Sequence, residues 1–122
     1  MARILIVDDD PVVVRLVQEV LTNEGHEVAT ASDGLDAMVR VQKDLPDLIV
    51  LDVMMPELNG FDVCHKIKFN DQTKHVPILL LTSRDQDLDP RLGKVMGIDY
   101  LHKPCSARDL VVRVKALLRS GE

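Results

Sequence analysis

The sequence predicts an α/β fold in which helices cover both faces of a parallel sheet. Short apolar runs alternate with segments of helical spacing along the whole chain. The hydrophobic share is 46% but aromatic residues make up only 2%, so the core must be built from aliphatic side chains, as in buried parallel strands. The 122 residues are enough for one domain, and no linker, repeat or low-complexity segment indicates a second.

Five short apolar runs, each bounded by turn-forming or polar residues, are predicted to be strands. Four are strong, and the fifth, around Tyr100 and Leu101, is weaker. The strong runs span residues 4–7, 28–31, 48–51 and 78–81. Because helical segments separate them, right-handed crossovers and a parallel sheet are expected.

The helix after the first strand has both of its ends marked. Asp10 can cap the first turn, Pro11 suits the first helical position, and Gly25 follows the end. Apolar residues recur at helical spacing along this helix and the next one, so each helix is expected to bury one face. These faces comprise Val13, Leu16, Val17, Val20 and Leu21 in the first helix, and Leu35, Met38 and Val39 in the second.

The third and fourth helices are expected further along the chain. In the third, Cys64 should pack on the core face together with Phe61 and Ile67. The fourth is expected to be short and to begin at Pro90 with Asp89 as its cap, because proline is disfavoured inside a helix but suits its first turn.

The last helix has Ser106 and Asp109 in a capping-box-like arrangement. Val111 and Val112 lie beyond its core stripe and are expected either to pack or to contribute to a dimer or partner face. The stripe itself comprises Leu110, Val114, Leu117 and Leu118.

Charge and cysteine content exclude several functional classes. With a net charge of −5 and a pI near 5.3, the chain has no basic face for a nucleic-acid backbone, so no direct nucleic-acid binding is expected. Cys64 and Cys105 form neither a CxxC pair nor a disulfide framework, which favours a cytoplasmic location. No apolar run approaches the roughly 20 residues that span a bilayer, so no membrane contact is expected. His26, His65 and His75 are expected to lie on the surface.

Polar side chains follow four of the predicted strands. In folds of this kind ligands bind beyond the carboxyl ends of the strands. Several carboxylates gather only if a cation compensates their charge, and hard oxygen ligands suit Mg²⁺, which takes phosphate as a further ligand. The set therefore predicts phosphoryl chemistry. Its members are Asp8, Asp9 and Asp10 after the first strand, Asp52 after the third, Thr82 and Ser83 after the fourth, and Lys103 after the fifth.

Within this set Asp52 is the candidate nucleophile. A buried strand would hold its backbone while its carboxylate meets solvent, and a carboxylate can attack phosphorus to give an acyl phosphate. Asp9, assisted by Asp8, would hold Mg²⁺. Lys103 would supply a fixed positive charge, and Thr82 a hydroxyl able to reach a phosphoryl oxygen.

These residues lie within four motifs, and the sequence that contains them resembles the receiver domains of two-component response regulators. Residues 4–10 look like the acidic opening of that family, and residues 51–60 resemble its phosphoacceptor strand and loop. Residues 81–83 match its hydroxyl switch position, and residues 99–104 match its lysine and proline. The resemblance extends over essentially the whole chain.

The resemblance implies a flavodoxin-like, doubly wound sheet of five parallel strands in the order 2-1-3-4-5, with five helices. It implies phosphotransfer to Asp52 from a sensor histidine kinase or a phosphotransfer protein, with Mg²⁺ held by Asp9, Asp52 and the backbone carbonyl of Met54. Thr82 would move toward the phosphoryl group while Tyr100 turns inward. The chain is expected to be a phosphoacceptor rather than an enzyme.

The family commonly signals through the fourth helix, the fifth strand and the last helix. This face is expected to control a downstream protein partner or a detached output domain, or to form a homodimer. No output domain is expected within residues 1–122.

Some positions depart from the family pattern or vary within it. Ser83 stands where alanine is common, and the stretch from Thr82 to Lys103 is one residue shorter than in most members. Met54 and Arg84 occupy positions that tune the lifetime of the phosphoryl group. Since a thioether cannot activate water and a guanidinium could shield the phosphoryl group, slow self-hydrolysis is our hypothesis.

Three alternatives compete with a phosphorylated receiver. A phosphohydrolase could use Asp8 as nucleophile and Asp10 as acid, although the threonine expected at position 12 is replaced by Val12. A flavin-binding module would need a hydroxyl- and glycine-rich loop after the first strand, where this chain is acidic. A pseudo-receiver would dock partners without phosphorylation, which the complete set of acids, hydroxyl and lysine disfavours.

Overall fold

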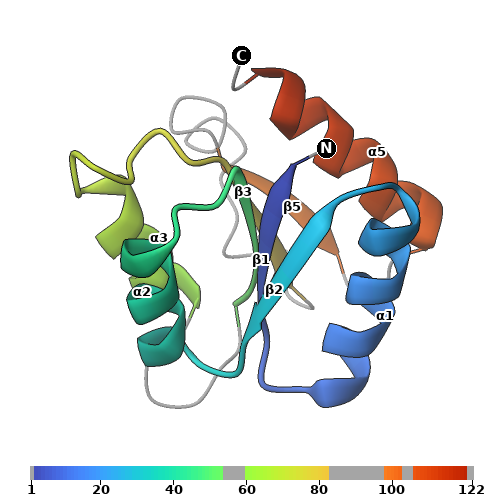
Figure 1. Cartoon of the computed structure of the whole chain (residues 1–122), viewed down its shortest axis with the longest axis horizontal. Helices are drawn as coiled ribbons and strands as arrows, with labels where there is room; N and C mark the ends of the chain where they lie inside the picture. The colour runs from blue at the N-terminus through green and yellow to red at the C-terminus, as the bar shows by residue number, and fades with distance from the viewer. Residues whose placement is uncertain (1, 54–59, 83–97, 103–105, 121–122) are drawn as a thin grey trace.

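The structure is a computed structural model that describes residues 2–53, 60–82, 98–102 and 106–120. Within these residues strands and helices alternate as predicted from β1 to β4, and α5 follows β5 (Figure 1). The elements are β1 (Arg3–Val7), α1 (Pro11–Asn23), β2 (Glu27–Ala31), α2 (Gly34–Lys43), β3 (Leu48–Asp52), α3 (Gly60–Lys68), β4 (Ile78–Thr82), β5 (Ile98–His102) and α5 (Ala107–Ser120).

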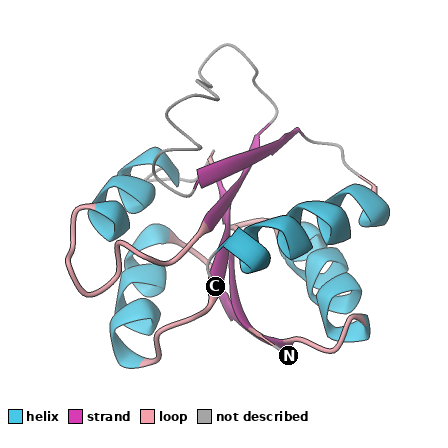
Figure 2. Ribbon diagram, turned by 90° about the horizontal axis from the view of Figure 1, so that it is seen from above, coloured by secondary structure: helices cyan, strands magenta, loops and turns pink. Residues whose placement is uncertain are grey.

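The five strands form one parallel sheet in the order β2-β1-β3-β4-β5. This order confirms the expected flavodoxin-like topology. Helices α1 and α5 cover one face of the sheet, and α2 and α3 cover the other (Figure 1). The view from above in Figure 2 shows the twisted sheet between these two helical layers. Each of the four strong strands begins and ends within one residue of its predicted run.

Both faces of the central strands β1, β3 and β4 are buried, which explains why these strands are apolar at consecutive positions. Alternate strand residues point to opposite sides and form two separate clusters. The α2–α3 core contains Leu5, Val7, Ile49, Leu51, Ile78 and Leu80, together with residues of α2 and α3. The α1–α5 core contains Ile4, Ile6, Leu48, Val50, Leu79 and Leu81, together with residues of α1 and α5.

The predicted helix ends are confirmed for α1 and for the start of α5. Oδ1 of Asp10 accepts a hydrogen bond from the backbone N–H of Val12 at 2.9 Å, and Oγ of Ser106 accepts one from Asp109 at 3.1 Å. After α1, Gly25 has a φ of +90°, a left-handed conformation that glycine adopts without strain from a Cβ atom.

The buried helix faces differ in part from the prediction. Leu35 and Val39 of α2 are each 62% exposed, whereas Ala37 and Val41 lie in the α2–α3 core. Helical spacing alone allows two overlapping apolar faces on this short helix. The helix packs on the face that contains Ala37, whose small side chain lets it approach the sheet. In α1, Leu16 was predicted to be buried but is 58% exposed.

In the described residues, helices α3 and α5 bury the faces predicted for them. Cys64 and Ile67 are buried in the α2–α3 core, as predicted for α3. The core stripe of α5 is confirmed, and Val112 lies outside it with 56% exposure. Four helices lie in the described residues; the helix predicted to begin at Pro90 falls outside them. No helix in the described part of the chain is long and apolar enough to cross a membrane.

A buried lysine organises the connection between α3 and β4. The Nζ of Lys68 donates hydrogen bonds to the backbone carbonyl oxygens of Val76 at 2.6 Å and Lys74 at 3.1 Å. Oγ1 of Thr73 donates to the carbonyl oxygen of Ile67 at 2.7 Å, near the end of α3. Burial lowers the pKa of Lys68. These bonds hold the chain that leads into β4.

His26 departs from its predicted surface position. Its side chain is half-buried, and Nδ1 accepts a hydrogen bond from the backbone N–H of Ala2 at 3.3 Å. Burial is the main cause that lowers the pKa of His26 from its usual value of 6.5. The acceptor role of Nδ1 requires that this nitrogen carry no proton, so protonation there would break the bond.

We expect His26 to make folding pH-dependent below neutrality. The unfolded chain takes up the proton near pH 6.5, before the folded chain does, so the free energy of unfolding falls as the pH drops from about 6.5 through the lower folded-state pKa. Urea unfolding at about pH 7.5 and about pH 5.5 should show a smaller pH dependence in His26→Gln than in the wild type. Equal pH dependence in both proteins would contradict this assignment.

Candidate functional site

Three carboxylates meet at the carboxyl-terminal edge of the sheet. One oxygen from each of Asp8, Asp9 and Asp52 lies within 4.8 Å of the others. The parallel pairing of β1 with β3 aligns Val7 with Leu51, so the two residues that follow, Asp8 and Asp52, reach the same level of the sheet. The structure thus brings together three of the acids predicted from the sequence.

The three acids differ in burial. Asp8 is 2% exposed and Asp52 is 5% exposed, whereas Asp9 is exposed to solvent. The backbone N–H of Asp8 donates to the carbonyl oxygen of Ala31 in β2 at 3.2 Å, and its Oδ1 accepts from the N–H of Asp10 at 2.9 Å. These bonds orient the Asp8 carboxylate, while the carboxylate of Asp9 remains accessible.

Asp10 has a separate role. Its Oδ1 caps α1 through the N–H of Val12, and the group of three acids found in the described residues does not include it. Sequence analysis missed the contribution of the Ala31 carbonyl oxygen. A main-chain acceptor leaves no residue-specific signal in a sequence, because every residue carries one.

The donor set fits a hard divalent cation. Three carboxylates within such a short distance repel one another, and two of them are almost fully removed from water. Carboxylate oxygens are preferred ligands of Mg²⁺, which retains water and phosphate oxygens at its other positions. The open side next to Asp9 would admit those further ligands.

Asp52 is the last residue of a strand whose five residues are all buried. The backbone pairing continues beyond it, because the N–H of Val53 donates to the carbonyl oxygen of Leu81 at 3.0 Å. Main-chain bonds on both sides therefore hold the Asp52 backbone rigidly. A carboxylate held in one position at a strand end is well placed to attack a group that approaches this edge of the sheet.

The neighbouring strands carry the predicted hydroxyl and aromatic residues. Asp52 pairs with Leu81 in β4, so Thr82 comes one residue beyond that pair, and Thr82 is 1% exposed. Thr82 pairs in turn with His102 in β5. Tyr100 is half-buried and packs against the α2–α3 core. Thr82 thus lies on β4, next to the strand of Asp52, and Tyr100 lies on the edge strand β5 beyond it.

Several predicted site residues fall outside the described residues. They are Lys103, the proposed fixed cation, and Met54, the proposed carbonyl ligand, together with Ser83 and Arg84. Their roles stay predictions.

Cys64 and His65 belong to no group of metal-ligating side chains in the described residues. Burial raises the pKa of the Cys64 thiol to about 11, so the thiol is protonated near neutral pH. The ring of His65 stacks on Phe69 with 4.2 Å between the ring centroids. Within the described residues, neither Cys64 nor His65 belongs to the acidic group.

The fold and the acidic group define a class of protein: a doubly wound α/β domain with three carboxylates that could hold a cation at the carboxyl edge of its sheet. The chain belongs to the response regulator receiver domain family, whose family model matches residues 4–115.

Individual relatives agree with this assignment. The chain is 46% identical over 121 residues to the alkaline phosphatase synthesis transcriptional regulatory protein PhoP of Bacillus subtilis, covering 98% of this chain and 50% of that protein. It is 43% identical to the transcriptional regulatory protein AfsQ1 of Streptomyces coelicolor, covering 100% of this chain and 53% of that protein. The chain therefore spans about half the length of these curated relatives.

Solved structures agree as well. The chemotaxis protein CheY4 of Vibrio cholerae is similar with a TM-score of 0.86 and 34% sequence identity, over 96% of this chain and 98% of that one. Receiver domains are regulatory phosphoacceptors in which phosphorylation on an aspartate is general, and they bind Mg²⁺ at an acidic pocket. Membership in this family favours a receiver over the phosphohydrolase and flavin-binding alternatives.

Proposed function

We propose that Asp52 is the phosphoacceptor of this receiver and that Asp8, Asp9 and Asp52 hold Mg²⁺ during the reaction. The observation that carries the proposal is the group of three carboxylates within 4.8 Å, in which Asp52 ends a fully buried strand. Carboxylates this close together repel one another, and a bound cation would compensate their charge. The backbone carbonyl of Met54 would be a further ligand.

In the proposed reaction a carboxylate oxygen of Asp52 attacks phosphorus. The new O–P bond forms as the bond between phosphorus and the donor's histidine nitrogen breaks, and the nitrogen keeps the electron pair. Bound Mg²⁺ would neutralise charge on the phosphoryl oxygens. Asp8, oriented by its bond from Asp10, would fix the ligand geometry, and Lys103 would hold a phosphoryl oxygen from another side.

The phosphoryl group would then act on the switch residues. The hydroxyl of Thr82 would donate to a phosphoryl oxygen, and Tyr100 would turn further into the α2–α3 core that it already contacts. Tyr100 lies in β5, which is joined to α5 by an ion pair between Asp99 and Arg113 at 2.9 Å. A change at the site would thereby reach the outer face of β5 and α5.

The partners follow from this role. The phosphodonor would be a sensor histidine kinase or a phosphotransfer protein, since response regulators act with such kinases and with output domains. The face of β5, α5 and the helix predicted from Pro90 would control a downstream protein or a detached output domain, or form a homodimer. We propose that residues 1–122 are one receiver domain and that it acts in the cytoplasm, where kinase and Mg²⁺ are available.

Phosphorylation by acetyl phosphate tests the proposal directly. Intact mass spectrometry should show one added phosphoryl group per chain in the presence of Mg²⁺ and almost none when Mg²⁺ is replaced by a chelator. The added group should be removed by hydroxylamine, which cleaves acyl phosphates and leaves phosphoserine and phosphothreonine intact. Failure to take up phosphate with Mg²⁺ would refute the function and favour a pseudo-receiver. Equal uptake with the chelator would refute the proposed role of Mg²⁺.

A further inference from the structure

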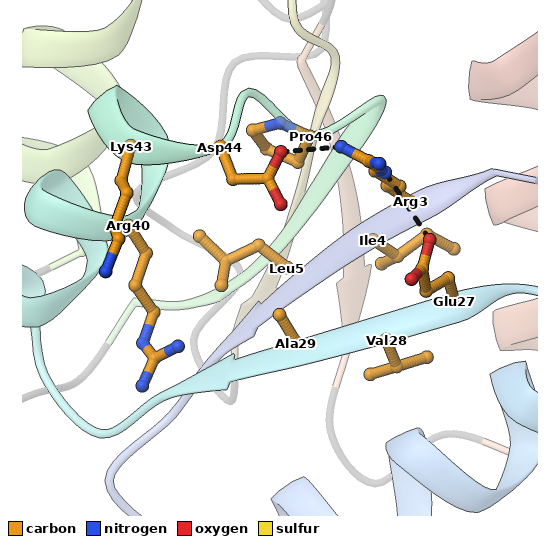
Figure 3. A pocket seen from close by; sticks show the side chains of 10 residues that line it. All are labelled: Arg3, Ile4, Leu5, Glu27, Val28, Ala29, Arg40, Lys43, Asp44 and Pro46. Carbon is orange, nitrogen blue, oxygen red and sulfur yellow. Dashed lines mark hydrogen bonds and ion pairs between the residues drawn. The ribbon is translucent and has the colours of Figure 1, made fainter.

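A second site lies at the opposite end of the sheet from the three acids. A cavity of about 450 Å³ is formed between the last turn of α2 and the first residues of β1 and β2 (Figure 3). Its floor includes Leu5, three strand residues before Asp8, which corresponds to about 10 Å along β1. The cavity shares no residue with the acidic group, so a ligand here would leave that group accessible.

The cavity exists because one side chain on the edge strand is small. Leu5 of β1 and Ala29 of β2 are paired in register and lie on the sheet face that α2 and α3 cover. Ala29 is exposed, since its methyl group does not fill the space between the edge strand and α2. The floor is therefore apolar, and its volume is within the range of sites that hold small organic molecules.

At one rim of the cavity a single cation, Arg3, lies against two carboxylates, so this set carries a net negative charge. Nη1 of Arg3 lies 2.6 Å from Oδ1 of Asp44, and Nε of Arg3 lies 3.4 Å from Oε2 of Glu27. Figure 3 shows both contacts as dashed lines across this rim. Arg3 is thus engaged by two carboxylates and offers little positive charge to a ligand.

The cavity wall formed by α2 differs from this rim because its cations have few carboxylate partners. Arg40 and Lys43 both line the cavity, and Figure 3 shows their side chains on the α2 side of the floor. Arg40 makes one long contact, 3.4 Å from Nε to Oδ2 of Asp36. Lys43 makes no ion pair with any residue in the described part of the chain. Two cations therefore face an apolar floor with most of their hydrogen-bonding capacity available.

We propose that this cavity binds a small organic anion that carries a carboxylate on an apolar body. The carboxylate would accept hydrogen bonds from Arg40 and Lys43, and the body would cover Leu5 and Ala29. The chain has a net charge of −5, so its overall field repels anions, and binding would depend on the local cations of α2.

Titration of the whole chain with octanoate, followed by ¹H–¹⁵N NMR without Mg²⁺ or phosphodonor, tests the site separately from the proposed function. We expect saturable shifts that centre on Leu5, Ala29, Arg40 and Lys43. Octylammonium has the same apolar body with the opposite charge and should not produce them. Equal shifts with both compounds, or no saturable shift with octanoate, would overturn the proposal.

Matched variants assign the binding to the cavity. Arg40→Gln and Lys43→Gln should each weaken octanoate binding by about tenfold, as expected for the loss of one hydrogen bond to a charged group. Lys66→Gln makes the same charge change on the exposed side of α3 and should leave the affinity unchanged. Wild-type affinity in Arg40→Gln and Lys43→Gln would overturn the proposal.

A filled cavity provides an independent check. Ala29→Leu adds apolar volume at an exposed position of an edge strand, where leucine can be accommodated without displacing the core. The spectrum should keep its dispersion while the octanoate shifts disappear. Unchanged octanoate binding by a folded Ala29→Leu protein would show that the ligand binds elsewhere and would overturn the proposal.

Discussion

Asp52→Asn is expected to reduce phosphate uptake from acetyl phosphate by a factor of roughly 100 or more. Asparagine keeps the size of the side chain but removes the anionic nucleophile and one of the three carboxylates of the cation site. Intact mass spectrometry of wild type and variant under the same Mg²⁺ concentration measures the effect. Because Asp52 is 5% exposed and held by the pairing of β3 with β4, the near-isosteric amide should keep the fold.

Asp10→Asn is the matched control for this variant. It makes the same chemical change two residues from Asp8, at a residue that caps α1 and lies outside the acidic group. Asparagine is an equally good cap, so both stability and phosphate uptake should stay close to the wild type. Equal uptake by Asp52→Asn and the wild type would defeat the assignment of Asp52, even if the protein were phosphorylated elsewhere.

Leu80→Ala is expected to lower the free energy of unfolding by about 2–5 kcal/mol. Leu80 is 1% exposed, lies in β4 between Leu51 and Tyr100, and belongs to the α2–α3 core. Its truncation leaves a cavity in the middle of the sheet, where both neighbouring strands prevent collapse. Urea unfolding followed by circular dichroism measures the change, which is a large share of the stability of a typical domain.

Leu35→Ala is the control for the core variant. The same atoms are removed from a side chain that is 62% exposed in α2, so the free energy of unfolding should change by less than about 0.5 kcal/mol. A similar loss in both variants would mean that burial in the structure does not govern their contributions, and would contradict the core described above.

Much of the sheet could be predicted from local signals. Residues 48–51 are apolar without alternation, which indicates a strand covered on both faces, and β3 is buried throughout. Asp10 and Pro11 mark the start of α1 because a cap needs only the residues next to it. The meeting of Asp8 with Asp52 was also predictable, since parallel strands end at the same edge of a sheet.

Other features depend on how separate segments of the chain pack against one another. The burial of Ala37 in place of Leu35 is settled by how α2 packs on the sheet, because the helical pattern alone allows both faces. Lys68 looks like a solvated charge in the sequence, yet it is 8% exposed because the carbonyl oxygens of Lys74 and Val76 fold back onto it. The half-buried position of His26 could not be predicted either, because its hydrogen-bond partner Ala2 is far away in the chain.

The amino-acid pattern was therefore sufficient for strand and helix alternation, for the caps of α1 and α5, and for the acids at the strand ends. These follow from propensities and hydrogen bonds within a few residues. The difference in burial between Asp8 and Asp9 and the cavity beside Ala29 arise from packing between β1, β2 and the helices. The burial of Lys68 arises where the chain between α3 and β4 folds back onto the end of α3. Such features require chain segments to meet in a particular register, and register is a property of the assembled fold rather than of any short stretch.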